Sequence, residues 1–551
     1  MDIPKEDQDR YAFYDKVLRD CFTTQESRKP NYNKWRQYYL FGTDQGDTDT
    51  TYNKIYPHID QILAFMYSNE TTKFSIDIGA SAEKIELKRV PKLNKAVNDE
   101  WHASNGDLVF MNGLEWAHVY GCTFLKLRWN GKQVEPFIVD PHDFGVLRED
   151  VSQLSRQEAF AQQYYYSKEQ LARELEACEH PRRKAIIEAV TTQAPRDNRG
   201  GDMMSRLVTN TAIPTSGGAV AQGNYNGALQ TYMDYTAKVS AEMVQMTELY
   251  VWDNAQDDFR VITLADPFMV VFDRPIKRMF VPSEIPFTQI CPNPDHSYFW
   301  GRSEVERLMP LQLMRTDRMN QIRRLMQLQA KMPMALTGFQ GVTDEMVATL
   351  NSPGGFIASD MPGAKAETVR IEIPDDLFKD IGMIDAMFEE MSGITNVMSG
   401  KGETGVRSTG HASQLARLGS ARTKKRALVI EDALEKIATL YLQLLQRYDA
   451  DKEYKDEDGD VFAPHQFTKD YVVKVDAHSN SPIFMEDQAE KAMTLFKAKA
   501  ITRERLIEMM GVPMEQLLKE ELKSKIEPAE ARQAAQEAQA EKLKVHQGGR
   551  A

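Results

Sequence analysis

The chain has 551 residues, of which 42% are hydrophobic, and it carries a formal net charge of −13. This length predicts roughly two to four structural units, each with its own core, and the acidic balance argues against a protein that coats nucleic acid through clustered Lys and Arg, although not against one past which DNA slides. The longest apolar runs, such as Pro267–Phe272, are far shorter than the ~20 residues of a membrane helix, and the polar start MDIPKEDQDR does not have the pattern of a signal peptide.

Alternating helical and strand patterns in the first part of the chain predict an α+β region up to about residue 300. Residues 1–70 are rich in aromatic side chains and have a helical pattern, with apolar residues at helical spacing in Ile55–Met66. The other elements that we expect are a strand over Phe74–Ile78, a helical stretch over about 90–118, a charged helical stretch over 150–190, and strands at Glu248–Trp252, Arg260–Leu264 and Pro267–Asp273. Residues 196–230 are rich in Gly, Asn, Ser and Thr and predict a flexible loop or insertion.

Within this region, one segment has the pattern of a β-hairpin. Thr123–Trp129 and Val134–Val139 are both strand-like, and Asn130-Gly131 lies between them. This dipeptide is typical of a tight turn in which both residues adopt positive φ. The following Asp140-Pro141-His142-Asp143 segment is then expected to close the hairpin as a strand-end turn.

The second part of the chain is predicted to be mostly helical. Ser303-x-x-Glu306 has the pattern of a capping box, and the helix that follows should kink or restart at Pro310 and continue to about Gln329. Six methionines between positions 309 and 334 suit a helix packed against neighbouring subunits, and plain core packing explains them equally well. The further expected elements are a Pro- and Gly-punctuated unit over 331–375, a helix over Asp375–Met391, a loop over Gly393–Ser408, one long helix over Thr409–Arg447, a strand at Tyr471–Val475, short helices over 486–525 and an Ala/Gln/Glu-rich tail.

The order of these parts resembles the portal proteins of tailed bacteriophages over roughly residues 50–525. The segments that carry the resemblance are FWGRSEVERLMPLQ, DDLFKDIGMIDAMFEEM, SGITNVMSGKGETGVRSTGHASQLARLGSARTKKRALVIEDALEKI and SPIFMEDQAEKAMTLFKAKAITRERLIEMMGVP, in that order. The resemblance implies a mainly helical α+β portal-type subunit. Its implied parts are a wing (1–300, with 196–230 as a flexible insertion), a first stem helix (301–330), a clip (331–374), a second stem helix (375–392), a tunnel loop (393–408), a long wing helix and wing strand (409–480), a helical crown (481–525) and a C-terminal tail (526–551).

The same resemblance implies a non-enzymatic function in the virion. The subunit would belong to a dodecameric ring at one capsid vertex, assembled in the host cytoplasm, and the ring would form the channel for packaging and ejecting double-stranded DNA. Its implied partners are the terminase large subunit, the head-to-tail adaptor, the major capsid protein and the scaffold protein, with no membrane and no cofactor. Two alternatives stay open: another virion structural protein such as an adaptor or scaffold, and a cytoplasmic DNA-processing enzyme.

The glycine-rich segment Gly393–Ser408 invites comparison with a nucleotide-binding loop. A phosphate-binding loop needs Gly, four residues and then Gly-Lys-Ser/Thr, but here Thr395 holds the first glycine position and Gly402 follows Lys401. The preceding segment is also helical rather than a strand. We therefore interpret this segment as a channel-lining loop, with Lys401, Glu403 and Arg407 as its DNA-facing residues.

Two basic clusters are candidates for contact with DNA phosphates or with acidic residues of a neighbouring subunit, and the second interpretation is preferred for both. The clusters are Arg315, Arg318, Arg323 and Arg324 on the first predicted stem helix, and Arg422, Lys424, Lys425 and Arg426 on the long helix. Four scattered cysteines without a Cys-x-x-Cys pair indicate reduced thiols rather than a zinc site or a disulfide framework. No catalytic or metal-binding residue is assigned, and His142 beside Asp140 and Asp143 is interpreted as part of a turn.

Overall fold

The structure is a computed structural model that combines helices and sheets, which confirms the α+β prediction. The residues that it describes are 1–43, 52–67, 74–76, 84–177, 179–190, 243–265, 269–278, 285–330, 334–338, 343–344, 346, 362–368, 372–392, 421–448, 454–455, 461–466, 471, 473–475, 492–503 and 506–507. The predicted insertion at 196–230, the loop at 393–408 and the tail at 526–551 lie outside these ranges. So does most of 486–525, of which residues 492–497 are helical.

The N-terminal part is helical, as predicted for residues 1–70. It contains α1 (Asp7–Phe22), α2 (Gln25–Phe41) and α3 (Ile55–Met66). The short strand β1 (Phe74–Ile76) pairs antiparallel with β14 (Val473–Val475), so the strands expected at these two distant positions meet in one sheet. Two further helices, α4 (Lys84–Ala103) and α5 (Gly106–Tyr120), lead into the first larger sheet.

A three-stranded antiparallel sheet contains the predicted hairpin. Its strand order is β3 (Val134–Val139), β2 (Thr123–Trp129) and β9 (Phe287–Ile290). The loop has four residues because Trp129 pairs with Val134. Gly131 has a φ of +93°, whereas Asn130 instead accepts the amides of Lys132 and Gln133 on its side-chain oxygen, each at 2.9 Å. The hairpin is confirmed. The prediction that both turn residues have positive φ was wrong, because an Asx-type turn forms instead.

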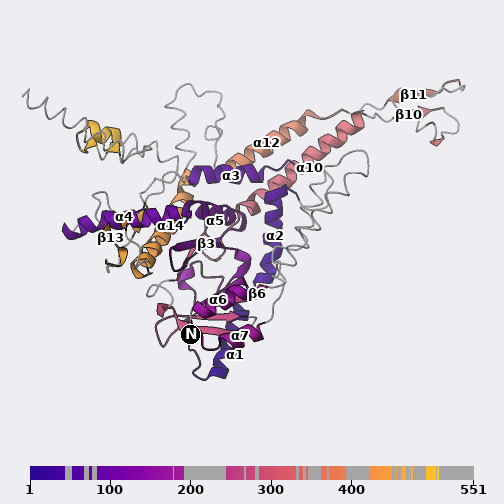
Figure 1. Ribbon diagram of the computed structural model, residues 1–551. Helices are drawn as coiled ribbons and strands as arrows, with labels where there is room; N and C mark the ends of the chain where they lie inside the picture. The colour runs from indigo at the N-terminus through magenta and orange to yellow at the C-terminus, as the bar shows by residue number, and fades with distance from the viewer. Residues whose placement is uncertain are drawn as a thin grey trace, which may run out of the picture.

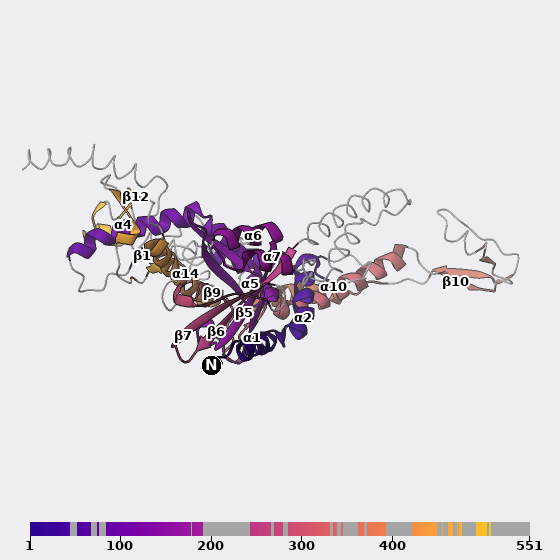
Figure 2. The ribbon, with the colours of Figure 1, turned by 60° about the horizontal axis from the view of Figure 1, so that its bottom comes forward.

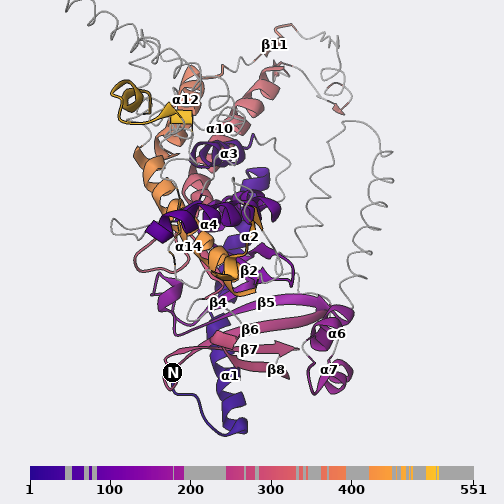
Figure 3. The same cartoon turned by 60° about the vertical axis from the view of Figure 1, so that its left-hand side comes forward.

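A five-stranded antiparallel sheet lies below it in Figure 1, and Figure 3 shows its strands lengthwise, one above another. Its strands, in order across the sheet, are β4 (Phe144–Val146), β5 (Ala159–Ser167), β6 (Met243–Asp253), β7 (Asp258–Ala265) and β8 (Met269–Pro275). Helix α1 packs its buried Tyr14, Val17 and Leu18 against one face of this sheet, while α6 (Lys168–Ala177) and α7 (Arg183–Ala189) pack at one end of the strands.

Strand β5 contradicts the prediction that residues 150–190 are helical throughout. Its sequence AFAQQYYYS pairs residue by residue with β6, from Ala159 opposite Val251 to Ser167 opposite Met243. Aromatic residues favour strands when they pack on a sheet, and Phe160 stacks on Tyr250 at 4.7 Å between ring centroids. The charged residues on both sides of this strand led to the prediction of a continuous helical stretch. The strands predicted at 248–252, 260–264 and 267–273 are confirmed, and the first of them is longer than expected.

The largest hydrophobic core surrounds α14 (Ala421–Tyr448), which accounts for the described part of the long helix predicted over Thr409–Arg447. Buried residues of α14 such as Leu434, Ile437 and Tyr441 belong to the same cluster as residues from α3, α4, α5 and the β1–β14 pair. This core therefore joins segments from both ends of the described chain (Figure 1).

Helix α10 (Glu304–Ala330) runs through Pro310 as one element of 27 residues, so of the kink or restart expected at this proline, the restart does not occur. Leu308 and Leu311 on either side of Pro310 are anchored in the core, and this packing compensates for the one amide donor that proline lacks. The Ser303 half of the predicted capping box is present at the start of the helix. Ser303 Oγ accepts the Glu306 amide at 3.2 Å and donates to the Val119 carbonyl at 2.6 Å.

Helix α12 (Asp375–Ser392) confirms the helix predicted over Asp375–Met391 and packs along α10. The two helices project together from the rest of the molecule, and the hairpin of β10 (Met334–Thr337) and β11 (Lys365–Thr368) lies at their far end (Figures 1 and 2). The remaining short elements are η1 (Pro141–Asp143), η2 (Leu154–Arg156), η3 (Ile276–Arg278), η4 (Pro464–Gln466), β12 (Tyr454–Lys455) and β13 (Val461–Phe462). None of the described helices is long and apolar enough to span a membrane.

Candidate functional site

The projecting pair of α10 and α12 is held in register by ion pairs between the two helices. Arg315 Nε donates to Asp385 Oδ1 at 2.9 Å, and Arg318 forms a close ion pair with Asp380. Lys54, from the segment before α3, adds a third contact to Asp385 at 2.7 Å. Burial on its own would raise the pKa of Asp385, but the hydrogen bonds and charges of Lys54 and Arg315 outweigh this effect and lower the pKa.

These contacts give two of the predicted basic residues partners within their own chain. Arg315 is 8% exposed and Arg318 is also engaged, whereas the sequence suggested acidic partners on a neighbouring subunit or DNA phosphates for both. Arg323 and Arg324, farther along α10, are exposed. The charges along this pair of helices therefore divide into an inner set that fixes the helix packing and an outer set on the surface.

Large apolar side chains are exposed on both helices of the pair. Each of the following is between 37% and 54% exposed: Leu313, Met314, Met319, Met326 and Leu328 on α10, and Phe378, Met383, Met387 and Met391 on α12. Near the base, by contrast, Val305, Leu308, Ile384 and Phe388 are buried in the main core. Exposed apolar side chains concentrated on one element of a protein are typical of an interaction surface. Of the two explanations for the methionine-rich stretch, packing against another chain fits Met314, Met319 and Met326 better than core packing does.

A buried ion pair joins the base of α10 to α14. Glu304, in the first turn of α10, is 1% exposed and accepts from Arg426 at 2.9 Å and from Asn293 at 3.1 Å. Two histidines lie in the electrostatic field of this pair, and burial lowers the pKa of both His58 and His118 to about 4. Both rings are therefore neutral at physiological pH, and the ion pair is the charged centre of this junction.

In the second basic cluster predicted from the sequence, one residue, Arg426, also forms an ion pair within its own chain. Arg426 is 7% exposed, and its partner Glu304 lies 122 positions earlier in the sequence. Lys425 beside it is exposed, and the side chains of Arg422 and Lys424 lie outside the described part. The capping-box pattern identified where α10 begins, but no local signal indicated that its first acidic residue is buried against α14.

A second buried network lies next to the loop that enters α10. The Arg28 guanidinium stacks over the Trp300 ring at 3.6 Å and contacts Glu149 at 3.0 Å. Glu149 also accepts the Trp300 indole N–H at 2.7 Å and the Thr24 hydroxyl at 2.6 Å. This network fixes α2 against the loop.

The turn at Asp140–Asp143 has the structural role that the sequence predicted. Asp140 accepts the His142 amide at 3.0 Å, and its carboxylate also contacts the buried His142 ring at 2.6 Å. Within the described residues, no group of three or more His, Cys, Asp or Glu side chains is arranged to hold a metal ion.

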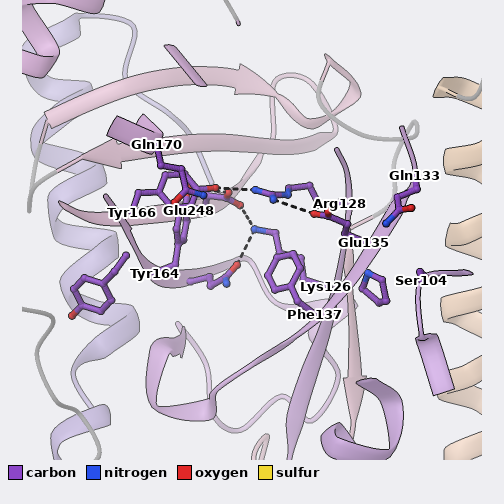
Figure 4. Close-up of a pocket in the computed structure, with 13 residues that line it drawn as sticks. Ser104, Lys126, Arg128, Gln133, Glu135, Phe137, Tyr164, Tyr166, Gln170 and Glu248 are labelled. Atoms are coloured by element: carbon purple, nitrogen blue, oxygen red, sulfur yellow. Dashed lines mark hydrogen bonds and ion pairs between the residues drawn. The ribbon is translucent and has the colours of Figure 1, made fainter. Parts of the chain in front are cut away.

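A cavity of about 390 Å³ lies between the two sheets, at the strands β2, β3, β5 and β6 (Figure 4). Figure 4 shows Lys126 pointing toward Glu248, and the two side chains form an ion pair at 2.7 Å. Burial lowers the pKa of Lys126, whereas for Glu248 the burial effect is outweighed by the attraction of Lys126, so that this pKa is also lowered. Gln162 accepts from Lys126 at 2.8 Å, and Tyr250 donates to Glu248 at 2.7 Å. These charged and polar groups bind one another across the cavity, and they thereby connect the three-stranded sheet to the five-stranded sheet.

The predicted channel residues Lys401, Glu403 and Arg407 lie outside the described residues. The surface that the structure does bring together is the α10–α12 pair, with inner ion pairs and outer apolar side chains. The sequence predicted both helices and their basic residues, but it did not identify Asp380, Asp385 and Glu304 as the partners of those residues.

A family model described as Phage SU10 portal protein matches residues 130–479, which is more than half of the chain. This range includes the five-stranded sheet, the projecting helix pair and α14. No curated protein matches the chain.

Proposed function

Because the chain belongs to the phage SU10 portal protein family, we propose that it forms a ring at one capsid vertex, which is the channel for packaging and ejecting double-stranded DNA. In this proposal the ring is a closed homo-oligomer, most simply a dodecamer, that assembles in the host cytoplasm. It docks the terminase large subunit during packaging and the head-to-tail adaptor afterwards. The capsid and scaffold proteins surround it at the vertex.

The observation that carries this proposal is the projecting helix pair. Met383 on α12 is 54% exposed and Met326 on α10 is 50% exposed, although both belong to helices whose bases are deeply buried. In a closed ring, every subunit presents one side to each neighbour, so such a pair is covered on both sides without leaving an open end. The Arg315–Asp385 and Arg318–Asp380 ion pairs support the role because they keep the helices together while their outer faces bind other subunits.

We assign the parts of the portal accordingly. Helices α10 and α12 are the two stem helices, and the β10–β11 hairpin at their far end belongs to the clip, where the packaging motor docks. Helix α14 is the long wing helix, and the two larger sheets form the wing. The tunnel loop is 393–408, with Lys401, Glu403 and Arg407 at the DNA. The crown is 481–525.

The charge of the chain fits a conduit through which DNA slides. Each phosphate that a protein neutralises releases counterions and strengthens binding, so a channel wall with many free cations would hold the DNA. The chain carries a net charge of −13, and Arg315, Arg318 and Arg426 are already paired with acids of the same chain. We propose that a separate terminase ATPase supplies the energy and that the ring itself turns over no nucleotide.

Negative-stain electron microscopy of the purified full-length protein tests the ring. Closed rings with an axial hole support the proposal, whereas a monomer or compact dimer at high protein concentration contradicts it. Met383→Glu should abolish the rings, because it places a charge in the apolar interface, while the matched control Met383→Leu should keep them. Rings that form equally well with Met383→Glu would rule out this helix face as the contact.

Two further measurements test the conduit role. ATP hydrolysis or metal-dependent DNA cleavage by the purified ring would contradict a passive conduit and would favour a DNA-processing enzyme. Replacing Lys401 and Arg407 with Ala should change DNA packaging or retention while the ring still assembles. If the ring itself is lost, these residues have a role in assembly instead.

A further inference from the structure

Two cysteines that are far apart in the sequence lie opposite each other where β2 and β9 meet. Strand β2 pairs antiparallel with β9, with Thr123 opposite Ile290 and Lys126 opposite Phe287. Extending this register by one residue places Cys122 opposite Cys291. All described cysteines, Cys21, Cys122 and Cys291, are free thiols.

The hydrogen bonding of the two strands indicates which type of pair this is. The Leu127 amide donates to the Pro286 carbonyl at 3.0 Å, which makes Leu127 and Pro286 a hydrogen-bonded pair. Hydrogen-bonded and non-hydrogen-bonded pairs alternate along an antiparallel ladder, so Cys122 and Cys291 occupy a non-hydrogen-bonded position. At such positions the Cα atoms are about 4.5 Å apart and the side chains approach each other, which lies within the range of roughly 4.4–6.8 Å that a disulfide spans.

Each of the two sulfur atoms has defined neighbours in the structure. Gln289 donates to Cys122 Sγ at 3.7 Å and to the Phe299 carbonyl at 3.1 Å. The Cys291 sulfur lies against Gly301, where an added Cβ would come within 2.4 Å of it. The Gly301 backbone therefore closes one side of the Cys291 side chain.

The two thiols differ in their access to solvent. Cys291 is partly exposed, whereas Cys122 is fully buried among aromatic side chains such as Phe124 and Phe299. Burial raises the pKa of Cys122, and a hydrogen bond to Cys291 and the charge of that group raise it further. A reagent from solution therefore meets Cys291 first, and Cys122 is the thiol that reacts second.

We propose that Cys122 and Cys291 are a redox-sensitive thiol pair that closes to a disulfide in the presence of a low-molecular-weight disulfide such as oxidised glutathione. The Cys291 thiolate attacks one sulfur of the oxidant, the S–S bond breaks, and one glutathione thiolate leaves. The Cys122 thiolate then attacks the Cys291 sulfur and expels the second glutathione. Two protein thiols are oxidised by two electrons, the oxidant is reduced to two thiols, and the two protein protons pass to the departing thiolates.

The position of this pair gives the disulfide a structural consequence. Cys122 lies between α5 and β2, directly before β2 begins, and Cys291 directly follows β9, before the loop that leads into α10. The cross-link would close a loop of about 170 residues and would restrict the unfolded chain accordingly. The inference is independent of the proposed portal function, since it depends only on the pairing of β2 with β9.

Peptide mapping of the full-length protein tests the pair. The protein is incubated with oxidised glutathione, alkylated at low pH and digested without reduction. We expect the peptide that contains Cys122 to be linked to the peptide that contains Cys291, two of the chain's four thiols to be lost, and dithiothreitol to restore both. Glutathione that stays on Cys291 of the unaltered protein, or a link between Cys291 residues of two chains, would overturn the proposal.

Two substitutions separate the roles of the thiols, and a third is the control. Cys122→Ala should trap glutathione on Cys291, because the second thiol is missing, whereas Cys291→Ala should leave the buried Cys122 unmodified. Cys21→Ala should still form the link, since Cys21 is buried against the five-stranded sheet. Modification of Cys122 in the Cys291→Ala protein would refute the order of attack. If a variant does not fold, the mapping of the unaltered protein still decides the proposal.

Discussion

Breaking the buried ion pair between Arg426 and Glu304 should destabilise the protein strongly. Arg426→Met leaves the Glu304 carboxylate, which is 1% exposed, without its main positive partner. Removing one partner of a buried ion pair costs about 3–5 kcal/mol of unfolding free energy. Asn293 at 3.1 Å and Arg307 at 3.9 Å still contact Glu304, so we expect a loss near the lower end, about 3 kcal/mol.

The double substitution identifies the cause of that loss. Glu304→Gln on its own should cost a similar amount, about 3 kcal/mol, because it leaves the Arg426 guanidinium buried. Glu304→Gln combined with Arg426→Met removes both charges and should cost about 2 kcal/mol rather than the sum of about 6 kcal/mol. Urea unfolding at neutral pH, followed by far-ultraviolet circular dichroism, gives the four free energies of this cycle.

A substitution on the same helix provides the control. Lys436 forms an ion pair with Asp432 one turn away, and both side chains are more than 60% exposed. Lys436→Met should therefore cost only about 0.3–0.5 kcal/mol. If the Arg426→Met and Lys436→Met proteins are equally stable, or if the cycle is additive, the ion pair does not hold α10 to α14.

Three further predictions concern other buried contacts. Burial lowers the pKa of His118 to about 4, so the unfolded chain binds a proton below pH 6.5 that the folded chain does not; this histidine alone should lower the stability by roughly 2 kcal/mol from pH 7 to pH 5. His118→Gln should remove that share of the pH dependence in thermal unfolding and leave the similar share of His58. Gly121 has a φ of +96°, and an added Cβ would lie 2.7 Å from the Trp300 carbonyl, so Gly121→Ala should cost about 2–3 kcal/mol and lower the unfolding temperature. Arg315→Met should speed amide hydrogen exchange in α12, because Asp385 loses its contact to α10; unchanged exchange would contradict the role of this ion pair.

The helices of the second half could be predicted because their signals are local. The capping pattern at Ser303 and the helical spacing over Asp375–Met391 each depend on residues within a few turns, and the structure contains both helices at these positions. The strand β5 could not be predicted in the same way. Its pattern becomes informative only beside β6, which follows about 80 residues later and provides the partner for each position.

The contacts of the candidate site depend on distant parts of the chain. Arg315 and Asp385 are 70 positions apart, and Arg426 and Glu304 are 122 positions apart. A sequence shows that such residues are charged, but the partner of each is set by how α10, α12 and α14 pack. The thiol pair could not be predicted for the same reason, because Cys122 and Cys291 meet only through the register of β2 and β9.

These ion pairs also reduce the number of basic residues that are candidates for the proposed contact with DNA. A guanidinium that already donates to a carboxylate of its own chain, as Arg315, Arg318 and Arg426 do, adds little counterion release when a phosphate approaches, because its charge is already compensated. Three of the eight basic residues in the two clusters therefore stabilise the packing of α10, α12 and α14. The candidates for contact with a duplex in the proposed channel are then the other five basic residues of these clusters and the proposed tunnel-loop residues Lys401 and Arg407. In the proposed ring, whose subunits carry a net charge of −13 each, a small number of cationic contacts would guide DNA without retaining it.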